Sequence, residues 1–112
     1  MSADTCIIYF GVRYDVTPDE FELIESKRDA RQIAARRVGL KSYWGIFLGH
    51  DRKIKRLLFV GKEVAIFGPE NLLSTKITPE HLSVIITETC EQLRLADFVG
   101  EVALHCEWLA DI

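Results

Sequence analysis

Polar and apolar residues alternate, or short apolar runs are bounded by turn residues, over five stretches of the chain. This pattern is typical of β-strands, and the stretches are residues 5–14, 42–49, 54–60, 63–67 and 101–108. After the first stretch, and again before the last, apolar residues recur every third or fourth position, as in an amphipathic helix. The pattern therefore predicts the element order β-α-β-β-(β)-α-β.

Both predicted helices begin with the same signal, a threonine followed by proline and an acidic residue. Thr17-Pro18-Asp19-Glu20 starts the first helix, and Thr78-Pro79-Glu80 starts the second. Threonine caps the free amides, proline fits the first turn, and the carboxylates favour the positive end of the helix dipole. We expect the first helix to run from this signal to about Val38, and the second to end near Phe98.

The middle of the chain, residues 42–68, has the pattern of an antiparallel meander with two turns. The polar sequence at residues 50–53 is expected to form the first turn. Gly61-Lys62 has the two-residue spacing of a tight hairpin and is expected to form the second. Gly11, within the first strand, predicts a bend or the close approach of a neighbour.

The last strand divides into two sets of residues by alternation. The apolar set is Val102, Leu104, Cys106 and Trp108. The mostly polar set is Glu101, Ala103, His105 and Glu107. We expect the first set to face the core and the second to face solvent.

Two strand-helix-strand units in succession predict the fold class. The chain is expected to be α+β, a two-layer sandwich of the ferredoxin-like split βαβ kind, with both helices on one sheet face. The meander supplies an extra strand, and its place in the strand order is open. A length of 112 residues predicts a single domain over residues 1–112.

Composition points to a cytoplasmic globular protein. Hydrophobic residues make up 48% of the chain, enough for a core, and no apolar run is long enough for a membrane span. The first residues lack the basic and apolar regions of a signal peptide. We expect Cys6, Cys90 and Cys106 to be buried and reduced, because they are widely spaced and form no Cys-x-x-Cys motif.

Charge is segregated along the chain. Residues 27–56 hold ten basic and two acidic side chains, a net charge of +8, whereas the remainder carries −11. Within the first predicted helix, Lys27 falls near the middle of the apolar stripe, with Arg28 and Arg31 close by. Snorkelling of these side chains to water explains this, and so does an anion pocket or partner-binding groove beside the sheet. The candidate anion- or partner-binding residues are Lys27, Arg28, Arg31, Arg52 and Lys53, and the candidate surface aromatics are Tyr9, Tyr43 and Trp44.

No motif specific to catalysis, phosphate loops or metal binding occurs, so the sequence predicts no cofactor and no metal, and leaves catalytic residues unassigned. His50, His81 and His105 are the histidines. His105 and Glu107 share one face of a strand, which is most often solvated surface and less often an acid–base or metal pair.

Three functional hypotheses follow. The first is a protein-interaction module, of the adaptor, inhibitor or immunity type, that binds a protein partner and forms a homodimer. The second is binding of RNA or single-stranded DNA by residues 27–56, which an overall pI near 5.6 disfavours. The third is a small enzyme or anion-binding domain with a pocket between the first helix and the sheet. We expect no membrane partner, and binding rather than catalysis.

Overall fold

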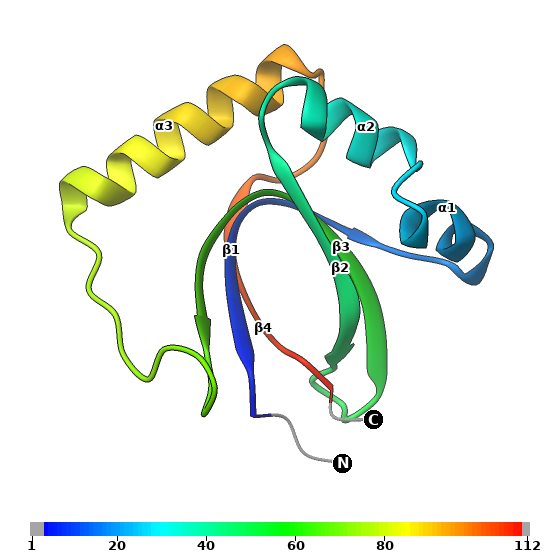
Figure 1. Cartoon of the computed structure of the whole chain (residues 1–112), viewed down its shortest axis with the longest axis horizontal. Helices are drawn as coiled ribbons and strands as arrows, with labels where there is room; N and C mark the ends of the chain where they lie inside the picture. The colour runs from blue at the N-terminus through cyan, green and yellow to red at the C-terminus, as the bar shows by residue number, and fades with distance from the viewer. Residues whose placement is uncertain (1–3, 111–112) are drawn as a thin grey trace.

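The computed structural model describes residues 4–110 of the chain. Its elements are β1 (Cys6–Asp15), the 3₁₀ helix η1 (Pro18–Glu20), α1 (Phe21–Glu25), α2 (Ala30–Arg37), β2 (Lys41–Leu48), β3 (Ile54–Phe67), α3 (Pro79–Leu95) and β4 (Ala103–Trp108). The strands form one antiparallel sheet in the order β2-β3-β1-β4 (Figure 1). The predicted α+β class is confirmed, and so is the turn at residues 50–53.

The predicted hairpin at Gly61-Lys62 is wrong, because both residues lie within the continuous strand β3. Gly61 is instead paired directly with Gly11 of β1. A Cβ atom on Gly11 would lie 2.0 Å from the carbonyl oxygen of Val60, and one on Gly61 would lie 2.1 Å from that of Phe10. The two glycines therefore allow the backbones of the central strands to approach more closely than side chains permit.

At this glycine pair the two central strands curve sharply, so that β2 and the end of β4 converge on the opposite side (Figure 1). An isolated bridge pairs Phe47 with Leu109, and the Ala110 amide donates to the Ile46 carbonyl at 3.0 Å. We call this bent, nearly closed sheet the arch. Bending gives the sheet an inner face that is enclosed by the sheet itself.

The inner face of the arch has its own apolar core, formed by Ile7, Tyr9, Phe47, Leu57 and Phe59. The rings of Phe47 and Phe59 meet edge to face with centroids 5.5 Å apart, a geometry that aromatic pairs prefer. Burial of each such large apolar side chain contributes about 1.5–3 kcal/mol to stability. This core holds the arch together without any helix.

The helices pack on the outer face of the arch. Ala35 of α2 and Leu93 of α3 cover Val12 and Val60, while α1 contributes Ile24 to a smaller cluster beside them. All three α-helices therefore lie on the same side of the sheet.

The first predicted helical region has the correct position, but it is not one continuous helix. It is divided into η1, α1 and α2 by a break at residues 26–29. Asp29 starts a new helix there, because its carboxylate accepts from the Arg31 amide at 2.9 Å. Lys27 lies in the break with a left-handed φ of 61°, so it interrupts the helix rather than occupying its apolar stripe.

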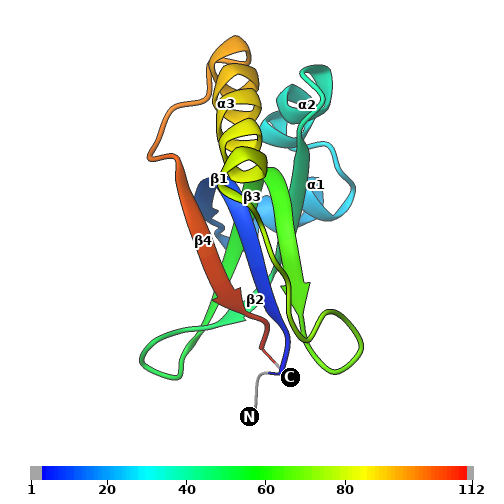
Figure 2. The same cartoon turned by 90° about the vertical axis from the view of Figure 1, so that its left-hand side faces the viewer.

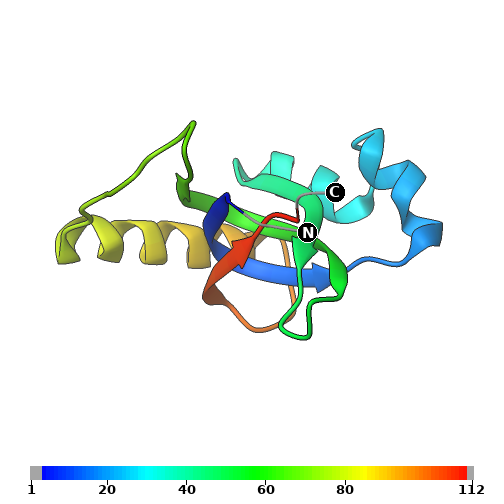
Figure 3. The same ribbon diagram turned by 90° about the horizontal axis from the view of Figure 1, so that it is seen from below.

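The start of α3 is as predicted, since the Thr78 hydroxyl accepts from the His81 amide at 3.2 Å. Ile85, Thr89 and Leu93 form the buried stripe of this helix, which ends at Leu95. Its N-terminal half extends beyond the strands (Figure 3). Within residues 4–110, no helix has both the length and the apolar character needed to cross a lipid bilayer.

Gly11→Ala should destabilise the protein by about 3 kcal/mol or more, because the added Cβ collides with backbone that cannot move without opening the bend. Gly45→Ala is the matched control in a strand, since its Cβ would meet only side chains, at 3.4 Å or more. That variant should lose less than about 1 kcal/mol. Urea unfolding followed by circular dichroism measures both, and equal stability of the two variants would contradict the proposed role of the glycine pair.

Candidate functional site

Strand β4 alternates as predicted, but the assignment of its two faces is wrong. Leu104, Cys106 and Trp108 are exposed, and Leu104 and Trp108 retain 50% and 51% of their accessible surface. Ala103 is half-buried and Glu107 is only 8% exposed. Within β4, the residues expected to face solvent therefore point into the arch, and those expected in the core lie on the outer face. Glu101, which precedes the strand, is exposed as predicted.

The reason for this inversion is the position of α3. The helix packs across β1 and β3 on the outer face, and β4 lies to one side with no helix in front of it (Figure 2). Leu104, Cys106 and Trp108 are neighbours on this uncovered side of one edge strand, and we call them the β4 face. Val102, just before β4, is also 38% exposed.

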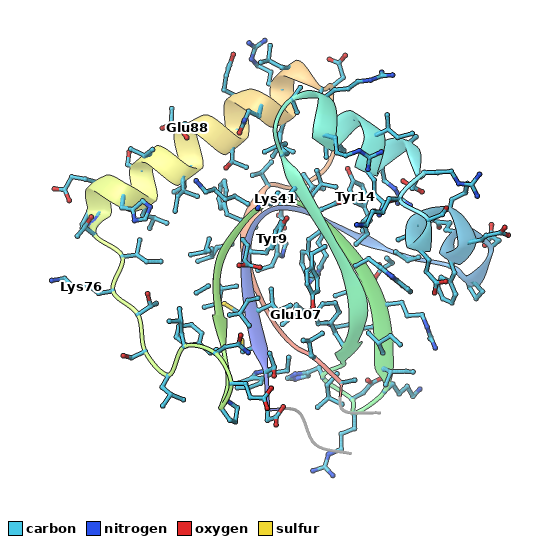
Figure 4. The ribbon with its side chains drawn as sticks, viewed as in Figure 1. Tyr9, Tyr14, Lys41, Lys76, Glu88 and Glu107 are labelled. Carbon is cyan, nitrogen blue, oxygen red and sulfur yellow. The ribbon has the colours of Figure 1, made fainter. Side chains whose placement is uncertain are left out.

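On the inner side of the arch, the buried carboxylate of Glu107 is paired with two cations whose side chains are partly exposed. The Lys55 ammonium donates to its carboxylate at 2.9 Å, and the Arg13 guanidinium lies 3.7 Å away. Two cations thus surround one carboxylate, which compensates the cost of removing it from water. Figure 4 shows Glu107 and Tyr9 within the space that the strands enclose.

Two further polar side chains of the inner face are held by backbone carbonyls. The Tyr9 hydroxyl donates to the Lys41 carbonyl at 2.9 Å, and Nε2 of His105 lies 3.2 Å from the Gly11 carbonyl oxygen. Burial raises the pKa of Tyr9, and nearby Glu63 adds to this effect. Burial also lowers the pKa of His105 below its ordinary 6.5. His105 and Glu107 thus share one face, as predicted, but each has a structural partner.

Among the predicted basic site residues, Arg31 is fully engaged with its own carboxylates. It forms ion pairs with Glu20 and, at 2.8 Å, with Asp29. Its guanidinium also lies 5.0 Å from the centroid of the Tyr14 ring. Hydrogen bonding from Arg31 is the largest cause of the lowered pKa of Asp29. Arg31 therefore stabilises the start of α2.

The other predicted basic residues are dispersed. Arg28 is exposed and donates from Nε to the Ser26 hydroxyl at 2.9 Å. Arg52 and Lys53 lie in the exposed turn between β2 and β3, at the opposite end of the molecule from α2 (Figure 1). The structure does not bring the five residues into one patch.

Lys27 is the exception, because it lines a hollow of about 440 Å³ between the helix break, α2 and the start of β2. Arg36 and Lys41 line the same hollow. Both residues belong to the basic segment at residues 27–56, but neither was predicted as a site residue. The sequence does contain one local signal for this hollow. Asp29 is a typical N-cap residue, and it predicts a second helix start and therefore a break before α2.

The three candidate surface aromatics have different environments. Tyr9 is 1% exposed and belongs to the inner core, so its assignment to the surface is wrong. Tyr43 is half-buried, and its ring stands 6.4 Å from that of Phe47. Trp44 is half-buried and packs against Phe21 with ring centroids 5.3 Å apart.

The cysteines are free, and only Cys6 is buried as expected, whereas Cys90 and Cys106 are exposed. Within the described part of the chain, no three His, Cys, Asp or Glu side chains are grouped as metal ligands.

Comparison of the chain with protein-family models, with curated proteins and with solved structures gives no match.

His105 should make the free energy of unfolding fall as pH is lowered through about 6.5. Its pKa is depressed in the folded protein, so the unfolded chain takes up a proton that the folded chain does not. His105→Phe keeps a ring against Phe59 and should remove this slope. The carboxylates of Glu20 and Asp29, whose pKa values are lowered from 4.5 and 3.8, act only at lower pH. Denaturant unfolding across this range would contradict the assignment if both proteins gave the same slope.

Proposed function

We propose that the protein is a small interaction module that forms a symmetric homodimer through the β4 face. The observation that carries this proposal is the exposure of Leu104 and Trp108, each about half accessible, on one side of an edge strand. Large apolar side chains that are grouped on an exposed surface are typical of sites of protein association.

The composition of β4 supports association through its edge. Edge strands are usually protected from pairing by lysine, proline or a bulge. The strand reads Ala-Leu-His-Cys-Glu-Trp and has neither lysine nor proline. Its only carboxylate, that of Glu107, is buried among cations inside the arch. The outer side of β4 is therefore without the usual charged protection.

A second copy of the chain is the occupant that fits this surface best. Two identical antiparallel strands are related by a two-fold axis, and such a contact is complementary to itself. Identical charges facing one another across that axis would repel, but the residues of the β4 face are uncharged. Pairing of β4 with its copy would join two sheets and bring the two β4 faces side by side, so that Leu104 and Trp108 of one chain contact those of the other.

In this proposal the chain acts by binding, and a protein partner would use the charged surfaces that the dimer leaves exposed. Binding of RNA or single-stranded DNA ranks behind it. The cations of residues 27–56 are divided between the α2 end and the β2–β3 turn, and Arg31 and Lys55 are occupied by carboxylates.

We also propose that the architecture is a ferredoxin-like two-layer sandwich. Its support is the strand order β2-β3-β1-β4, in which β1 and β3 are central and each helical crossover passes over one strand. The packing of all helices on the outer face agrees with this class.

Leu104→Lys should convert the dimer into a monomer, because it places a charge in an apolar contact twice, once from each copy. The wild-type protein should have twice the 12.8 kDa mass of one chain in light scattering at micromolar concentration, and the variant should have the single mass. Trp108→Glu should have the same effect.

Val84→Lys is the matched control. Val84 is 49% exposed, but it lies on the side of α3 away from the buried stripe of Ile85, Thr89 and Leu93. This variant should remain dimeric. A monomeric wild-type protein, or loss of the dimer in all three variants alike, would reject the proposed interface.

A further inference from the structure

The hollow beside α2 has an apolar floor and a cationic wall. Ile24 and Leu40, both buried, lie at its base, and the cations Lys27, Arg36 and Lys41 line it. Its volume of about 440 Å³ falls in the range of small-molecule sites in proteins. It lies on the β2 side of the sheet, whereas the β4 face is at the opposite edge.

The three cations are not neutralised by a carboxylate of the described part of the chain, unlike several other basic residues. Arg31, Lys55 and Arg94 each form an ion pair with a carboxylate. For Lys27, Arg36 and Lys41, the structure shows no ion pair with any carboxylate among residues 4–110. Glu25 is the one acidic residue that lines the hollow, so the lining carries an excess of two positive charges. Such an excess at a concave surface attracts an anion.

Hydrogen bonds fix the backbone that carries two of these cations. The Arg36 guanidinium donates from Nη2 to the Lys27 carbonyl at 3.0 Å, and the Gln32 amide donates to the Ile24 carbonyl at 3.0 Å. These bonds tie α2 to the break that precedes it. The bond to Lys27 uses one of the five N–H donors of Arg36, and the others remain for a ligand.

The third cation is positioned from the opposite side of the sheet. The Lys41 carbonyl accepts from the buried Tyr9 hydroxyl at 2.9 Å, which anchors the start of β2 to the inner core. Figure 4 shows Lys41 at the end of β2 that adjoins α2, above Tyr9. The hollow is therefore assembled before any ligand binds, which reduces the entropy lost on binding.

We propose that this hollow binds a phosphomonoester that carries a planar ring, of the size of a mononucleotide. Arginine and lysine together suit a phosphate dianion, because arginine offers paired donors and lysine a point charge. The Ser42 hydroxyl also lines the hollow and can donate to a phosphate oxygen. Trp44, on the helix side of β2, provides aromatic surface for a ring. Tyr43 also lines the hollow, but its ring packs against the inner core. The volume exceeds that of phosphate alone.

Isothermal titration of the full-length protein with adenosine monophosphate tests this proposal, with adenosine and inorganic phosphate as the two partial probes. We expect saturable binding of the nucleotide, at least about tenfold weaker binding of phosphate, and no measurable binding of adenosine. Equal affinity for adenosine and its monophosphate would overturn the proposal, and so would equal affinity for phosphate and the nucleotide, or no binding of the nucleotide at millimolar concentration.

Arg36→Gln should weaken nucleotide binding by about tenfold or more, because it removes both the charge and the donors to phosphate. Arg37→Gln is the matched control, since Arg37 is exposed in the same turn of α2 but does not line the hollow; its affinity should stay within about twofold. If loss of the bond to Lys27 unfolds the first variant, Lys41→Gln tests the same claim and should also weaken binding. Equal effects of the Arg36 or Lys41 variants and the Arg37 variant would contradict the site.

A short oligonucleotide with a 5′ phosphate distinguishes a free nucleotide from a nucleic-acid end. Binding of the mononucleotide at least as tightly as the oligonucleotide supports the small-molecule site. Much tighter binding of the oligonucleotide, lost on Arg52→Gln at the distant turn, would overturn it in favour of a nucleic-acid surface. This site does not rest on the proposed dimer, and Leu104→Lys should leave nucleotide affinity unchanged.

Discussion

Gly11 and Gly61 face each other where the central strands bend, and the rest of the structure depends on this close contact. Without it, β1 and β3 would run straight and Phe47 could not reach Leu109. The bend creates an enclosed inner face with an aromatic core, and it leaves the helices on the outer face. The inner core is formed by residues of β1, β2 and β3, so it does not require apolar residues from β4. Strand β4 can therefore direct Glu107 inward and its apolar residues outward.

The sequence predicted correctly those helix starts, helix ends and turns that depend on residues close to one another in the chain. The caps at Thr17 and Thr78, the end of the first helical region near Val38 and the turn at residues 50–53 each depend on neighbouring residues. Gly61 was misinterpreted because glycine occurs both in tight turns and where two paired strands approach closely. Only the pairing of Gly61 with Gly11 shows that the second case applies here. The faces of β4 were exchanged because alternation separates two sets of residues without showing which set a second layer covers.

The candidate sites were predicted only in part, for a related reason. Lys27 was singled out correctly as anomalous, but its neighbours in the hollow come from α2 and β2 and meet only because the helix breaks. Arg31 was also singled out, yet Asp29 and Glu20 neutralise it. An aspartate two residues before an arginine at a helix start is the local feature that distinguishes such a structural cation from one available to a ligand.

The two proposed surfaces lie at opposite edges of the sheet, so assembly and ligand binding can proceed independently. The chain has two tryptophans, and one is found at each place. Trp44 lines the hollow, and Trp108 lies half accessible on the β4 face. Since indole emission depends on the polarity of its surroundings, the protein contains an intrinsic optical reporter for each surface, and replacing either indole by phenylalanine would isolate the signal of the other.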